Sequence, residues 1–74
     1  MSETLQRNKI QLGENGGFIF FDKNNREVGT IDEDGMHVKN SVRLNGEPIP
    51  KVFKDDVEAM YYISMALMYG EVEE

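Results

Sequence analysis

His37 is the only imidazole in the 74 residues, so it is the first candidate for acid–base chemistry. It lies between Met36 and Val38, in a stretch where apolar and polar residues alternate as in a strand with one buried face. A general base needs an oriented partner and a nucleophile or water beside it, and no motif around His37 supplies either. We therefore predict that the protein is not an enzyme and that it has no catalytic residue.

Three consecutive acidic residues, Asp32, Glu33 and Asp34, stand before Gly35 and look like the first half of a calcium-binding loop. A complete loop needs alternating oxygen ligands and a bidentate Glu at its twelfth position, and this register is not met. A turn is the better interpretation. A structural zinc site is also disfavoured, because tetrahedral zinc takes about four Cys or His ligands and the chain has no Cys. We expect no metal and no cofactor.

Gly13, Gly16 and Gly17 could suggest a phosphate-binding loop, but no strand and helix flank them in the required order. We interpret them as turn and bulge positions.

The net charge of −6 comes entirely from the C-terminal part of the chain. Up to Lys54 the acidic and basic residues balance, and beyond it there are six acids and no base. An acidic chain is a poor ligand for nucleic acid, because binding to phosphates needs clustered Lys and Arg. Glu71, Glu73 and Glu74 are interpreted as a solvated tail, and a DNA-mimicking acidic surface is the weaker alternative.

Turn signals recur about every ten residues, and they predict short antiparallel strands. The signals are Asn15-Gly16, Asn24-Asn25, Asp34-Gly35 and Asn45-Gly46. Gly17–Phe21 and Glu27–Ile31 should form a hairpin, with further strands at Lys9–Leu12, Met36–Lys39 and Ser41–Leu44. Pro48 and Pro50 cannot donate hydrogen bonds to a sheet, so Glu47–Pro50 should be a strand exit or an extended connector.

The segment after Asp55 predicts a helix of about 14 residues. Asp55 is a good N-cap, Glu58 has the capping-box spacing, and Gly70 follows as a C-terminal cap. The predicted class is therefore mainly β with one C-terminal α-helix (α+β). We divide the single domain into a flexible N-terminal segment (1–8), a β-hairpin region (9–50) and the helix with its acidic tail (51–74).

The predicted helix has almost no polar face, and a helix that is apolar all round is normally buried on every side. A chain of 74 residues has few strands with which to cover it, so we predict a homo-oligomer. The expected interface has heptad spacing and comprises Phe53, Val57, Met60, Ile63 and Leu67. The apolar stretch is too short to cross a membrane, which takes about 20 residues, and no signal peptide is apparent.

The stretch 17–49 resembles the short β repeats of bacteriophage tail fibres, tailspikes and baseplate-associated proteins. The segments that carry the resemblance are FIFFD (18–22), REVGTI (26–31), DGMHV (34–38) and VRLNGEPI (42–49). The resemblance implies a structural protein of the virion, with interwoven strands, a homotrimeric state, and other virion proteins as partners. It assigns no receptor-binding residue.

Two hypotheses for function follow. The first is a non-enzymatic virion protein that forms a homo-oligomer, with a trimer favoured, for assembly or host attachment. The second is a small acidic phage-encoded inhibitor or regulator that binds a host protein through its hairpins and acidic C-terminus. Neither hypothesis involves nucleic acid or a membrane.

Overall fold

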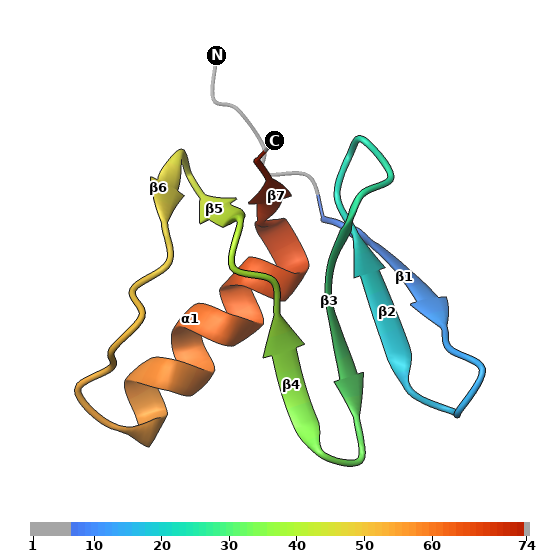
Figure 1. Cartoon of the computed structure of the whole chain (residues 1–74), viewed down its shortest axis with the longest axis horizontal. Coiled ribbons are helices and arrows are strands. Elements are labelled where there is room, and N and C mark those ends of the chain that lie inside the picture. The colour runs from blue at the N-terminus through green and yellow to red at the C-terminus, as the bar shows by residue number, and fades with distance from the viewer. Residues whose placement is uncertain (1–6, 74) are drawn as a thin grey trace.

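The computed structural model describes residues 7–73, and its elements follow the predicted order of short strands and one C-terminal helix (Figure 1). The fold is mainly β with a single helix, which confirms the α+β class. The elements are β1 (Lys9–Leu12), β2 (Phe18–Phe21), β3 (Glu27–Asp32), β4 (Gly35–Val38), β5 (Val42–Leu44), β6 (Glu47–Pro48), α1 (Asp56–Tyr69) and β7 (Glu71–Val72).

The first sheet is an antiparallel meander in the order β1-β2-β3-β4. The predicted hairpin is confirmed as β2 and β3, and a bulge at Phe20/Phe21 interrupts its register. Each predicted turn contains a residue with positive φ, at Gly16, Asn25, Gly35 and the pair Asn45-Gly46. These residue types tolerate that conformation, which is why the turns could be predicted from the sequence.

The second sheet is small and has the order β6-β5-β7. Pro48 lies in its edge strand β6, where a missing N–H costs no ladder hydrogen bond. β7 pairs antiparallel with β5 through Val42 and Val72. The sequence predicts a solvated tail at this position, whereas the structure has β7. A strand of two residues has too little periodicity to be recognised in the sequence, and β7 depends on pairing with β5.

The helix begins and ends where the sequence predicts. The Asp55 side chain accepts a hydrogen bond of 2.8 Å from the Glu58 N–H, and the Glu58 side chain accepts one from the Lys54 N–H. At the other end, Gly70 is extended (φ −70°) rather than left-handed. Gly70 is needed there for space, since a Cβ atom would lie 2.4 Å from the Ala66 carbonyl oxygen.

The core lies where α1 meets both sheets, and α1 contacts β3, β4 and β5. Its buried apolar residues are Phe20, Val28, Val42, Ala66 and Leu67. Gly29 lets the helix approach β3 closely, because a Cβ atom there would lie 2.8 Å from the Leu67 side chain. Among residues 7–73, no helix is long and apolar enough to cross a membrane.

Candidate interaction surfaces

One face of the first sheet is apolar across all four strands. Residues paired across antiparallel strands point to the same side, so the register assigns the members of this face. They form two rows, Ile10–Phe20–Gly29–Val38 and Leu12–Phe18–Ile31–Met36. This is the face that carries Phe20 into the core, so it is the face on which α1 packs.

The helix covers only part of this face. In Figure 1, α1 lies across β4 at one side of the sheet, and β1 and β2 stand at the other side. Phe20 is buried, whereas Ile10, Leu12 and Phe18 are between 46% and 69% exposed. We call these three residues the sheet surface. These apolar side chains lie on the same face of the sheet as the core residue Phe20. No element within residues 7–73 buries them.

A second exposed apolar group lies on α1. Val57, Met60 and Tyr61 are spaced i, i+3 and i+4, which places them on one side of a helix. They are 58% to 76% exposed. We call these three residues the helix surface.

The five residues of the predicted interface do not all share one surface. Val57 and Met60 belong to the helix surface, and Ile63 is partly buried against the core. Leu67 is 1% exposed and lies within the core of its own chain. The half-buried Phe53 packs against Tyr62, with ring centroids 5.9 Å apart.

Sequence reasoning missed Tyr61 and the whole sheet surface as candidate contact residues. The alternation of Ile10 and Leu12 in β1 shows that one face is apolar. It does not show which half of that face the helix covers.

Asp22 is a fully buried carboxylate at the end of β2, and it joins the two sheets. Its Oδ1 accepts hydrogen bonds from the N–H groups of Asn24 (2.8 Å) and Arg26 (3.0 Å), and its Oδ2 accepts one from the N–H of Val72 (2.9 Å). Burial alone raises the pKa of Asp22, but the three N–H donors and the Arg26 charge outweigh it and hold the pKa below its ordinary value of 3.8. With its oxygens satisfied by the backbone, this carboxylate is a structural element and has no free acceptor directed at a ligand.

Asn8 ties the start of β1 to the end of α1. Its Nδ2 donates to the carbonyl oxygens of Leu67 (3.1 Å) and Gly70 (2.9 Å). Its backbone N–H donates to the carbonyl oxygen of Met68 (2.8 Å). The last carbonyls of a helix have no partner within the helix, so this side chain acts as a C-terminal cap from outside it.

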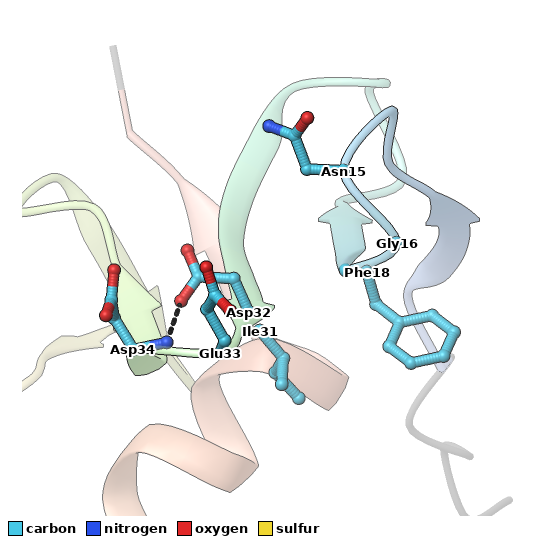
Figure 2. A pocket seen from close by; sticks show the side chains of 8 residues that line it. Asn15, Gly16, Phe18, Ile31, Asp32, Glu33 and Asp34 are labelled. Atoms are coloured by element: carbon cyan, nitrogen blue, oxygen red, sulfur yellow. Dashed lines mark hydrogen bonds between the residues drawn. The ribbon is translucent and has the colours of Figure 1, made fainter.

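A shallow depression of about 420 Å³ lies between the β1–β2 turn and the β3–β4 turn. Figure 2 shows the acidic side chains at its rim, with Asp32 accepting a hydrogen bond of 2.9 Å from the Asp34 N–H. Asp32 also lies 3.1 Å from the His37 Nε2 atom. These contacts confirm the predicted turn. Across residues 7–73, no group of three His, Cys, Asp or Glu side chains is arranged to hold a metal ion.

The acidic residues after the helix lie beside basic ones. Glu71 pairs with Lys23 at 2.7 Å, and Glu73 pairs with Arg43. The hydrogen bond from Lys23 to Glu71 raises the pKa of the lysine. These pairs are exposed and contribute little stability, but they reduce the net negative field at this end of the molecule.

Comparison with family models, with curated proteins and with solved structures finds no match to this chain.

Proposed function

We propose that this chain is a non-enzymatic structural protein that works as a homo-oligomer in a phage virion. In this role it contributes to a tail fibre, a spike or a baseplate-associated part, for assembly or host attachment. The observation that carries the proposal is the pair of exposed apolar surfaces on one small chain.

The oligomer is supported by the cost of leaving such surfaces in water. Six large apolar side chains, three on the sheet and three on the helix, are each about half exposed or more. Apolar area favours burial by roughly 25 cal/mol per Å², so association that covers both surfaces is favourable. The placement in a virion is supported by the resemblance of residues 17–49 to phage β repeats, and the same resemblance favours a trimer.

The alternative, an acidic inhibitor that binds a basic partner, has less support. It needs free carboxylates on a folded face. Glu71 and Glu73 face Lys23 and Arg43, and Asp55 caps the helix. Much of the C-terminal acidity is therefore engaged within the chain.

Light scattering after size exclusion, at low and at high salt, tests the proposal. We expect a mass of three times 8.5 kDa at both salt concentrations, because burial of apolar side chains is not screened by ions. A complex with a host protein that weakens steeply with salt, formed by a chain of 8.5 kDa, would favour the inhibitor instead.

A further inference from the structure

Asn15 and Asn45 are the only asparagines of the chain that precede a glycine, and both Asn-Gly pairs lie in exposed turns. The backbone nitrogen of the glycine in such a pair can attack the side-chain amide carbon of the asparagine, because glycine carries no side chain that obstructs the approach. A Cβ atom at Gly16 or at Gly46 would meet no atom within 4 Å apart from those of its chain neighbours, so the space around both glycines is open. Access alone therefore does not distinguish the two pairs.

Hydrogen bonding of the glycine N–H does distinguish them. The Gly16 N–H donates to the Gly13 carbonyl oxygen at 3.2 Å, whereas the Gly46 N–H donates to no acceptor within residues 7–73. The glycine nitrogen attacks only after it has lost its proton, and a hydrogen bond to a carbonyl oxygen stabilises the N–H form. The nitrogen of Gly46 is therefore the more readily activated of the two.

The two turns also differ in how firmly their strands hold them. The turn at Asn45 and Gly46 has φ values of 54° and 82°, as in a type I′ turn, and only two residue pairs connect its strands β5 and β6. The turn that contains Asn15 joins β1 to β2, which are connected by four residue pairs. It is also closed by a hydrogen bond of 2.7 Å from the Gly13 N–H to the Gly17 carbonyl oxygen. Attack on the side chain requires the turn to deform, and this breaks fewer hydrogen bonds at Asn45.

We propose that Asn45 is a site of spontaneous deamidation and that the fold directs this reaction to Asn45 in preference to Asn15. The Gly46 nitrogen loses its proton to hydroxide and forms a bond to the Cγ of Asn45. The bond from Cγ to the side-chain nitrogen breaks, and that nitrogen takes a proton from water and leaves as ammonia. Water then adds to one of the two carbonyl carbons of the cyclic imide and breaks its C–N bond, which gives aspartate or isoaspartate. Water and hydroxide are the only co-reactants, and the reaction is independent of the proposed function.

Deamidation at Asn45 should open the edge of the second sheet. Isoaspartate continues the main chain through its side chain, which adds a methylene group to the turn. Arg43 holds this turn in its present form, with its Nη1 donating to the Gly46 carbonyl oxygen at 3.0 Å. The longer turn no longer has the type I′ geometry that pairs Leu44 with Glu47. Because β7 still pairs with β5, the change should be confined to β6 and its turn.

Peptide mapping after incubation at mildly alkaline pH tests this assignment. Trypsin cleaves after Lys and Arg, so Asn15 is recovered in the peptide 10–23 and Asn45 in the peptide 44–51. Mass spectrometry measures the conversion of each side-chain amide to an acid, and chromatography separates the aspartate and isoaspartate forms. We expect Asn45 to be converted about fivefold faster than Asn15 in the folded chain, because the backbone hydrogen bond of Gly16 contributes a factor of this order.

Two controls separate the effect of the fold from that of the dipeptide. In the same chain unfolded in guanidinium chloride the hydrogen bond between Gly16 and Gly13 is absent, so the two rates should converge. In Asn45→Gly the turn keeps a residue that tolerates positive φ but has no side-chain amide to lose. The peptide 44–51 of this variant should keep its mass, and Asn15 should react as in the wild type.

Equal rates in the folded chain, or faster conversion of Asn15, would overturn the proposal. An equally strong preference for Asn45 in the unfolded chain would also overturn it, since the neighbouring residues and not the fold would then direct the reaction. The solution mass of the protein is a separate measurement, so failure at Asn45 leaves the proposed homo-oligomer standing.

Discussion

The carboxylate of Asp22 accepts a hydrogen bond from the backbone N–H of Val72, fifty residues later in the chain. The other carboxylate oxygen holds the loop between β2 and β3. One buried side chain thus fastens the first sheet to the last strand of the second.

Asp22→Asn should destabilise the fold. An amide has one acceptor oxygen and one NH₂ donor, so it cannot satisfy both the loop N–H groups and the N–H of Val72. A buried donor left without a partner costs about 1–3 kcal/mol. Urea unfolding measures the change, with the exposed Glu33→Gln as control. Equal stability of wild type and Asp22→Asn would show that the contact with Val72 contributes nothing.

The Asp22 carboxylate should also make the free energy of unfolding depend on pH in the acidic range. The fold lowers the pKa of Asp22, so its contribution is complete above the ordinary value of 3.8 and is lost as the pH falls below that value toward the lower pKa of the folded state. The free energy of unfolding should therefore drop more steeply as the pH falls below 3.8 in the wild type than in Asp22→Asn. Parallel curves for the two proteins would contradict this assignment.

Gly29→Ala should be among the most damaging single changes. A Cβ atom at Gly29 would lie 2.1 Å from the His37 carbonyl oxygen, between β4 and the helix. The expected cost is about 3 kcal/mol, at the upper end of the range for overpacking. Gly13→Ala is the control, because its Cβ atom would make ordinary contacts no closer than 3.4 Å. Similar melting temperatures for the two variants would argue against close packing at Gly29.

Asn8 should stabilise the end of α1 through its amide donors. Asn8→Ala removes the hydrogen bonds to the Leu67 and Gly70 carbonyls, at an expected cost of about 1–2 kcal/mol. Asn8→Asp should cost more, because a carboxylate would face two carbonyl oxygens and the negative end of the helix. Thermal unfolding ranks the variants, and an Asp variant as stable as the wild type would refute the capping role.

Leu67 and Met60 are seven residues apart on one helix, but they should have different roles. Leu67 should stabilise the core of its own chain, and Met60 should contribute to association. Leu67→Ala opens a cavity in the core and should cost about 2–5 kcal/mol of stability. Met60→Ala should leave the stability of the isolated fold nearly unchanged and weaken association. Chemical unfolding at low concentration, together with the solution mass, separates the two effects. A Leu67→Ala protein with unchanged stability would show that Leu67 is not a core residue.

Most of the features that the sequence predicts correctly are specified by residues close together in the chain. Asn-Gly and Asp-Gly pairs specify turns through their own backbone preferences, and Asp55 with Glu58 specifies the start of the helix. The strands of the first sheet follow from alternation between those turns. Each of these features depends on residues close together in the chain.

The features that sequence reasoning missed depend on distant contacts. β7 exists because Val72 meets Val42, and the burial of Asp22 follows from its bond to Val72. The heptad spacing grouped Leu67 with Met60, but the close approach at Gly29 takes Leu67 into the core. Which half of the sheet the helix covers is decided by the tertiary packing, so the sheet surface could be found only in the structure.

Sedimentation of the wild-type chain across a hundredfold dilution tests the central claim most directly. We expect an oligomer, with a trimer favoured, that dissociates only at the lowest concentrations. A mass of 8.5 kDa at every concentration would contradict the account, because the sheet surface and the helix surface would then remain in water.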